Sequence, residues 1–183
     1  MTETPKYSVI KKHKNMELRQ YAGYIQAEVS ISENDYKSAV YKGFNSLAGY
    51  IFGGNISRQK VEMTAPVQVS HSEKIPMTAP VIVTGAGIFT VAFIMPSAYT
   101  LESLPVPQDK NIHFVTVPAQ QMAAIRFSGF FQQSEIQKQK ERLSQWLERE
   151  KLETEGDFTI AGYDPPWIPW FLARNEVLIK IKI

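Results

Sequence analysis

The sequence predicts an α+β fold in which a distorted antiparallel β-barrel or curved sheet carries two helices. Several segments alternate polar and apolar residues, with the period of two that marks a half-buried strand. Two longer segments repeat apolar residues every three or four positions, as one face of a helix does. Both halves of the chain show the order strand, strand, helix, strand, strand. We therefore expect a pseudo-twofold β-β-α-β-β repeat within a single domain, residues 1–183.

The composition is that of a globular protein, because 44% of the residues are hydrophobic and 21% are charged. The absence of cysteine excludes disulfides, thiolate metal sites and cysteine nucleophiles. No apolar run reaches the roughly 18 residues that a membrane span needs, and the N-terminus lacks an apolar signal core. The net charge is only +2, and the basic residues are scattered apart from Lys11, Lys12 and Lys14. We expect a cytoplasmic protein with no membrane span and no nucleic-acid partner.

The first half begins with strands over residues 6–31, whose later part alternates Ile25, Ala27, Val29 and Ile31 with polar residues. A helix is predicted next, since Ser32 and Asp35 have the spacing of a capping box. One helical face then collects apolar residues at spacings of three and four: Tyr36, Val40, Phe44, Leu47 and Ile51. The glycines at 53 and 54 are typical of a helix end.

Three further strands are predicted at 60–69, 75–84 and 88–95. The first two contain the same pentapeptide, MTAPV, at 63–67 and 77–81. Proline cannot donate to a sheet ladder, so Pro66 and Pro80 should mark bends or edges. The threonines of the two copies have no evident catalytic base. We interpret the repeat as two neighbouring bent strands rather than a duplicated active site.

The second half repeats the plan. Strands are predicted at 111–118 and 121–129, and a helix capped by Ser134 carries Ile136, Lys140, Leu143 and Leu147 on one face, with Trp146 at its edge. The tripeptide at 155–157 is predicted to close this helix. The last strands are expected at 158–164 and 175–183, on either side of the proline-rich loop DPPWIPWFL at 164–172.

Candidate catalytic residues are few. The three histidines do not form a metal-binding spacing, and no nucleophile elbow, phosphate loop or dinucleotide fingerprint is present. The carboxylates of the second helix alternate with basic residues, which indicates surface ion pairs. A hydrolase that uses one activated glutamate stays open, with Glu62 and Glu176 as candidates.

Several motifs together resemble the SOUL haem-binding protein family. They are ELRQY, GFNSLAGYIFGGN, KVEMTAPV, IPMTAPV, FIMPSAYTLESLPVP and AGYDPPWIPWFLARNEV, and they run in order from about residue 6 to residue 182. The doubled MTAPV and the PWxPWF loop are most similar to the bacterial members. The resemblance implies a distorted antiparallel barrel with two helices. It also implies non-covalent binding of haem or another tetrapyrrole, or of a different amphipathic small molecule.

The resemblance also suggests site residues. An apolar patch at the first helix, with basic side chains for the haem carboxylates, corresponds here to Tyr41, Lys42, Phe44 and Tyr50. We expect the Trp167, Trp170 and Phe171 loop to form the rim. Arg174, in the matching RNEV segment, is expected to meet either a ligand carboxylate or a structural acid.

The iron ligand is less clear. Some relatives place a proposed ligand histidine where this chain has Gln20, and glutamine is a poor iron ligand. His71, predicted in a loop between the two MTAPV copies, is a weak alternative. We therefore predict a non-catalytic binding protein for haem or a related tetrapyrrole. The alternatives are a generic small-molecule module, related to gyrase-inhibitor-like domains, and the glutamate-dependent hydrolase.

Overall fold

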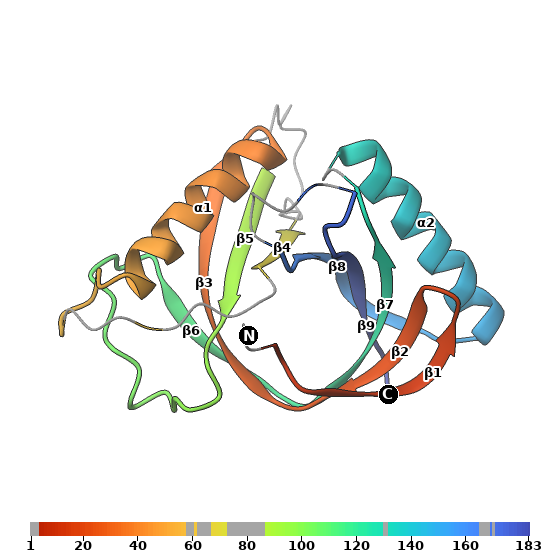
Figure 1. The fold of residues 1–183 in the computed structure, drawn as a ribbon, viewed down its shortest axis with the longest axis horizontal. Helices are drawn as coiled ribbons and strands as arrows, with labels where there is room; N and C mark the ends of the chain where they lie inside the picture. The colour runs from red at the N-terminus through yellow and green to blue at the C-terminus, as the bar shows by residue number, and fades with distance from the viewer. Residues whose placement is uncertain are drawn as a thin grey trace, which may run out of the picture.

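The computed structural model describes residues 4–57, 61, 67–72, 87–129, 132–164, 169 and 171–183. Within these residues it contains nine strands and two helices (Figure 1). The first half holds β1 (Tyr7–His13), β2 (Met16–Tyr21), β3 (Tyr24–Glu33), α1 (Tyr36–Ile51), β4 (Val67–Ser72) and β5 (Gly87–Ile94). The second half holds β6 (His113–Val117), β7 (Gln120–Phe127), α2 (Gln133–Glu150), β8 (Thr154–Gly162) and β9 (Asn175–Ile181).

The strands form one antiparallel sheet in the order β1-β2-β7-β9-β8-β4-β5-β3-β6. If β2 to β5 are matched in sequence with β6 to β9, the order of these eight strands reads the same from either end. The pseudo-twofold axis therefore passes between β4 and β8, which pair directly, and β1 is an added edge strand. The predicted twofold repeat is confirmed.

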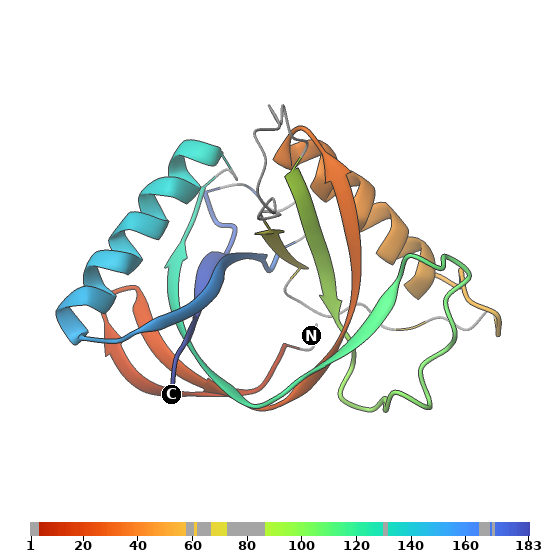
Figure 2. The ribbon, with the colours of Figure 1, turned by 180° about the vertical axis from the view of Figure 1, so that it is seen from behind.

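The sheet is strongly curved, and the two helices lie on its outer side, one on each half (Figures 1 and 2). Among the described strands, the end strands β1 and β6 do not pair with each other, so the sheet stays open. The predicted α+β class is confirmed. Of the two predicted forms, the structure has the curved sheet and not the closed barrel. No helix in the described part of the chain has the length and apolar character needed to cross a membrane.

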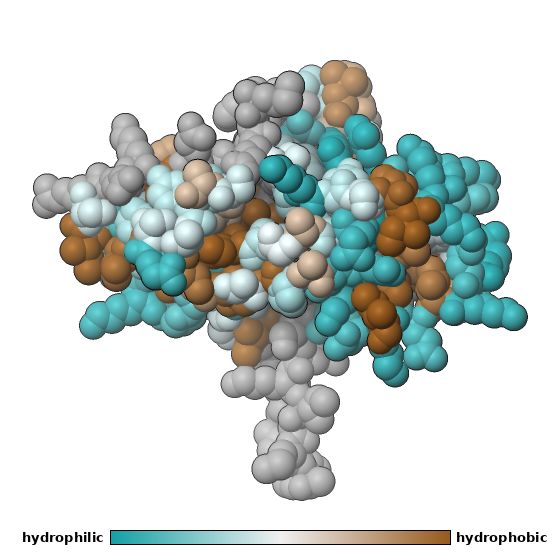
Figure 3. All heavy atoms as spheres, turned by 90° about the horizontal axis from the view of Figure 1, so that it is seen from below, coloured by the Kyte–Doolittle hydropathy of each residue, from teal (hydrophilic) through white to brown (hydrophobic). Residues whose placement is uncertain are grey.

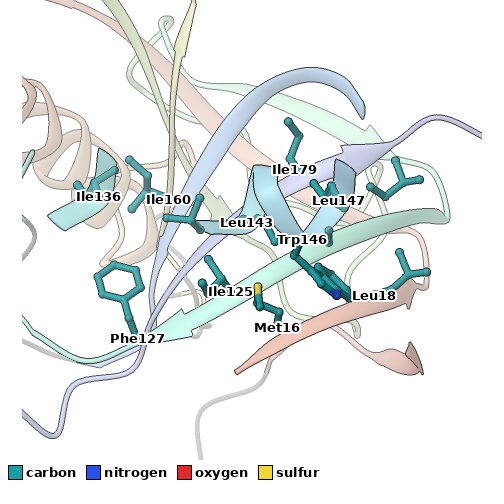
Figure 4. Close-up of a cluster of buried hydrophobic side chains, with 13 residues drawn as sticks. Met16, Leu18, Ile125, Phe127, Ile136, Leu143, Trp146, Leu147, Ile160 and Ile179 are labelled. Carbon is teal, nitrogen blue, oxygen red and sulfur yellow. The ribbon is translucent and has the colours of Figure 1, made fainter. Parts of the chain in front are cut away.

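Two hydrophobic clusters fix the helices to the sheet. Beneath α2, side chains from the helix and from β2, β7, β8 and β9 form one cluster, in which Leu143 is fully buried and Trp146 is 2% exposed (Figure 4). Beneath α1, Leu47, Tyr50 and Ile51 pack on Val91 and Phe93 of β5. The predicted apolar faces of both helices are thus buried, and Trp146 lies within the core rather than at its edge.

Helix α1 has the predicted body but a different start. Asp35 is its N-cap and accepts a hydrogen bond from the Ser38 amide at 2.9 Å, whereas Ser32 still belongs to β3. The prediction of a capping box at Ser32 is wrong because β3 continues to Glu33, paired with β5. After the helix, Gly53 has a φ of 111°, which a side chain would disfavour.

Helix α2 also differs from the prediction at both ends. Its N-cap is Gln132, which makes no side-chain capping bond, and Ser134 lies inside the first turn. Lys151 ends the helix in the left-handed conformation. Residues 155–157 belong to β8, where the register with β9 shifts between Glu155 and Thr159. The glycine in this tripeptide therefore serves a strand irregularity and not a helix end.

The strands around the MTAPV repeat are only partly described. The predicted strand at 88–95 corresponds to β5. Of the predicted strand at 60–69, residue 61 and the start of β4 are described, and the whole of 75–84 lies outside the described residues. His71 lies within β4, opposite Phe89, so its prediction as a loop residue is wrong.

Candidate functional site

The outer face of α1 exposes a tyrosine and two lysines. Tyr41 is 70% exposed, and Lys42 forms an ion pair with Glu33 of β3. Lys37 and Asn45, one turn to either side of Tyr41, are also exposed. Gly49, two turns beyond Tyr41, is exposed, and a Cβ there would meet nothing within 4 Å. Gly49 therefore adds no side chain to this face near the end of the helix. Helix α1 contains no acidic residue.

The other two predicted aromatic residues of α1 point inward. The Phe44 ring packs edge-on to Phe93, with centroids 5.3 Å apart. Tyr50 is 1% exposed, and its hydroxyl donates to the Pro105 carbonyl at 2.9 Å. Burial raises the Tyr50 pKa to about 12. Phe44 and Tyr50 therefore hold α1 on the sheet, whereas Tyr41 and Lys42 lie on its exposed face.

Helix α1 lies very close to the sheet at Gly43. A Cβ at this position would come within 2.5 Å of Val91 Cγ2. Only glycine allows this approach, because the branched valine side chain is stiff. The orientation of the exposed Tyr41 face thus depends on a close contact on the opposite side of the helix.

The predicted aromatic rim is described only in part. Trp167 and Trp170 lie outside the described residues. Phe171 is 58% exposed, next to the 65% exposed Leu172. The amide of Leu172 donates to the Pro169 carbonyl at 2.8 Å, which closes a turn there. The role of this loop as a rim stays a prediction.

Arg174 belongs to a buried cluster on the inner face of the second half. Glu176 of β9 is fully buried and accepts hydrogen bonds from Arg19 at 2.7 and 3.0 Å and from the Tyr163 hydroxyl at 2.8 Å. Arg174 donates to Glu176 Oε1 at 2.8 Å through its terminal nitrogen and at 3.2 Å through Nε. Its guanidinium also lies over the Tyr163 ring, 3.9 Å from the centroid. The acid that Arg174 meets is thus Glu176, a structural one.

The two arginines keep Glu176 ionised. Burial alone would raise the pKa of its carboxyl, but the hydrogen bonds and charges of Arg19 and Arg174 outweigh burial, and the pKa is lowered. The Arg19 pKa is raised in turn, because the pairing with Glu176 outweighs the effect of its own burial. A carboxylate whose oxygens are occupied by these donors is a poor general base.

Sequence reasoning missed Arg19 and Tyr163 as partners of Glu176. Arg19 lies in β2, and Glu176 is 157 positions further along the chain. The available signal was a charged residue in the middle of a short strand, between Leu18 and Tyr21. Such a residue is rarely buried unless it is paired.

The candidate iron ligands do not gather at α1. Gln20 is half-buried in β2, and its amide donates to the Tyr21 carbonyl at 3.3 Å. His13 and His113 are exposed in β1 and β6, and the side chain of His71 is outside the description. The described residues contain no group of three or more histidines and acids that would hold a metal ion.

The described part of the chain thus forms a small α+β fold, with one curved antiparallel sheet and two helices. The family model described as "SOUL heme-binding protein" matches residues 2–180, and the chain belongs to this family. The proteins named "Heme-binding protein 2" of Mus musculus and Homo sapiens are 29% and 30% identical. Each alignment covers 91% of this chain, with 82% of the mouse protein and 78% of the human protein.

Solved structures share the fold at low sequence identity. The C-terminal domain of EcmrR is 13% identical with a TM-score of 0.68, over 96% of this chain and 98% of that domain. A structure described as a hydrolase from Listeria innocua is 12% identical with a TM-score of 0.62, over 94% of each chain. At these identities the likeness concerns the fold alone.

Proposed function

We propose that this protein binds haem or a related tetrapyrrole without covalent attachment and without catalysing a reaction. The observation that carries the proposal is membership of the SOUL heme-binding protein family over residues 2–180. The two relatives named for haem binding, which align over 91% of this chain, support it further.

The binding surface in this proposal is the exposed face of α1. Tyr41 supplies an aromatic side chain for the flat macrocycle, and Lys37 and Lys42 supply positive charge for its carboxylates. The exposed Gly49 leaves room for a planar ligand to lie close to the helix backbone. Phe44 and Tyr50 contribute by holding this face in place, and the rim is assigned to the 164–172 loop.

Contact with the macrocycle, rather than with the metal, provides the affinity in this proposal. The described part of α1 contains no histidine or methionine. Metal-free protoporphyrin is therefore expected to bind about as tightly as haemin. We propose no nucleic-acid partner, because the net charge is only +2 and nucleic-acid binding usually needs a strongly basic surface.

A glutamate-dependent hydrolase is a weaker candidate. Its described glutamate, Glu176, is enclosed by Arg19, Arg174 and Tyr163 and has a lowered pKa. The other candidate, Glu62, lies outside the described residues. The alternative of a generic small-molecule module has support from a separate cavity, which is lined by Lys6, Tyr24 and Ile94.

The test is a haemin titration followed by the Soret band. Wild-type protein should give a saturable shift at micromolar haemin, and a Tyr41→Ala/Lys42→Gln variant should bind roughly tenfold more weakly, because it loses one aromatic contact and one exposed charge. The matched control is Ile10→Ala/Lys138→Gln, which removes an exposed apolar group from β1 and an exposed lysine from α2, both away from α1. The proposal would be contradicted if wild type gave no saturable shift of the Soret band, or if the two variants bound haemin equally well.

A further inference from the structure

A second candidate site lies away from α1, where the N-terminal segment crosses the ends of three strands. In Figures 1 and 2 the segment that leads into β1 lies between the two halves, near the lower end of β5. Here Thr4, Pro5 and Lys6 cover a cavity of about 280 Å³. The amide of Ala22 donates to the Lys6 carbonyl at 3.0 Å, which fixes this segment over the cavity. No residue of α1 lines it.

The walls of this cavity are mainly apolar. Ile94, at the end of β5, and Met95 and Pro96, which follow it, are buried residues that line it. Two half-buried tyrosines, Tyr24 and Tyr99, stand beside them. Burial raises the pKa of Tyr24, whose hydroxyl bonds with Gln68, so this phenol stays neutral. In the view from below, hydrophobic residues are exposed at several places among polar ones (Figure 3).

Among the described residues that line the cavity, Lys6 is the one basic residue and none is acidic. Among the residues that the structure describes, Lys6 takes part in no ion pair, in contrast to Lys11, Lys12 and Lys42. An unpaired ammonium at the mouth of an apolar cavity favours a ligand with an apolar body and one negative group.

The size of the cavity limits this ligand. Pockets that enclose drug-sized molecules span about 300–1,000 Å³, and this cavity lies just below that range. A whole tetrapyrrole therefore does not fit inside it. A single aromatic ring with a short carboxylate side chain does.

We infer that this cavity binds a small aromatic or branched aliphatic monocarboxylate. The apolar part lies between Tyr24, Tyr99 and Ile94, and the carboxylate meets the Lys6 ammonium at the mouth. This site goes beyond the proposed tetrapyrrole function and does not depend on it. Failure of one leaves the other standing, since they use different surfaces.

The probe for the test is 3-phenylpropionate, with its neutral analogue 3-phenylpropanamide, followed by two-dimensional NMR of the labelled protein. Addition of the acid should shift the signals of Tyr24, Ile94, Met95 and Tyr99 in a saturable way. The amide should bind roughly threefold to fivefold more weakly, the range of an exposed charge pair. Lys6→Gln should remove this difference, whereas Lys110→Gln, another exposed lysine, should keep it.

A second variant checks the location. Thr116→Trp places a large ring at the exposed rim formed by β6, and it should block both probes. The inference is overturned if no saturable shifts appear at millimolar acid, if they centre elsewhere, or if acid and amide bind equally to wild type. Undiminished binding to a folded Thr116→Trp variant would overturn it as well.

Discussion

The two helices occupy equivalent places in the twofold plan but present opposite surfaces. Helix α2 carries eight charged residues of both signs, so its outer face is that of a solvated helix. Helix α1 carries two lysines, no acidic residue and an exposed tyrosine. The same topology thus supports one helix whose outer face carries charges of both signs and one whose outer face carries only basic charges and an exposed tyrosine.

The inner faces of the two halves also differ in how deeply their polar side chains are buried. On the inner face of the second half, Glu176 is buried with Arg19 and Arg174. In the first half, β3 presents Gln26 and Glu28, whose side chains bond to each other at 2.9 Å. The second half therefore contains a buried group of ion pairs, whereas the polar side chains on the inner face of the first half are only half-buried.

The largest expected effect is at the buried cluster. Glu176→Gln should lower the free energy of unfolding by about 3–5 kcal/mol, because it removes the carboxylate that pairs with Arg174 and leaves the buried Arg19 with Glu17 alone. Urea unfolding at pH 7 measures this. The control is Glu155→Gln, which breaks an exposed pair with Lys180 and should leave the free energy of unfolding nearly unchanged. Similar losses in both variants would remove the distinction between the two kinds of charge.

The acid limb of stability provides an independent check on Glu176. Because its folded pKa is lowered from the ordinary 4.5, its ionised form stabilises the fold above that value. This stabilisation is lost as the pH falls through the lowered pKa. Between pH 5 and pH 3, wild type should therefore lose more stability than Glu176→Gln. An equal loss in both proteins would show that Glu176 does not set this limb.

A smaller effect is expected at the contact between α1 and β5. Gly43→Ala should cost about 1–3 kcal/mol, because its Cβ would overlap Val91. Gly49→Ala, on the exposed side of the same helix, should instead stabilise the protein by about 0.5–1 kcal/mol. Thermal unfolding of both variants gives the signs. If both alanines shift the midpoint in the same direction, the close packing of α1 is not what the distances indicate.

The smallest effects are expected at the helix starts. Asp35→Ala should cost about 1 kcal/mol, because it removes the cap of α1, and Asp35→Asn should retain most of it. Gln132→Asp should stabilise α2 by up to about 1 kcal/mol, since the wild-type N-cap makes no side-chain bond there. Denaturant midpoints compare the three variants. A neutral Gln132→Asp would mean that α2 gains nothing from a side-chain cap.

Local patterns in the sequence predicted the elements well. The apolar spacing from Tyr36 to Ile51 matches the bounds of α1, since one face of the helix is buried and the other is not. The starts were harder, because Ser32 and Asp35 are both good caps and only the pairing of β3 with β5 decides between them. The strand order could not be predicted from local patterns, because it depends on pairings between segments that are far apart in the sequence.

The candidate site was less predictable than the fold. Helical spacing alone did not separate Tyr41, which is exposed, from Tyr50, which is buried and bonded to Pro105. Both tyrosines lie on a wide aromatic arc in sequence. Which part of the arc faces the sheet is set by the contact of Gly43 with Val91, and no local signal announces that contact.

The central claim is that a tetrapyrrole lies on the exposed face of α1. Haemin contains a paramagnetic iron, so it broadens the amide signals of nearby residues in a two-dimensional NMR spectrum. The account predicts broadening that centres on Lys37, Tyr41, Asn45 and Gly49 and spares the exposed face of α2. Broadening centred on α2 or on the cavity beneath Lys6, or none at saturating haemin, would contradict it.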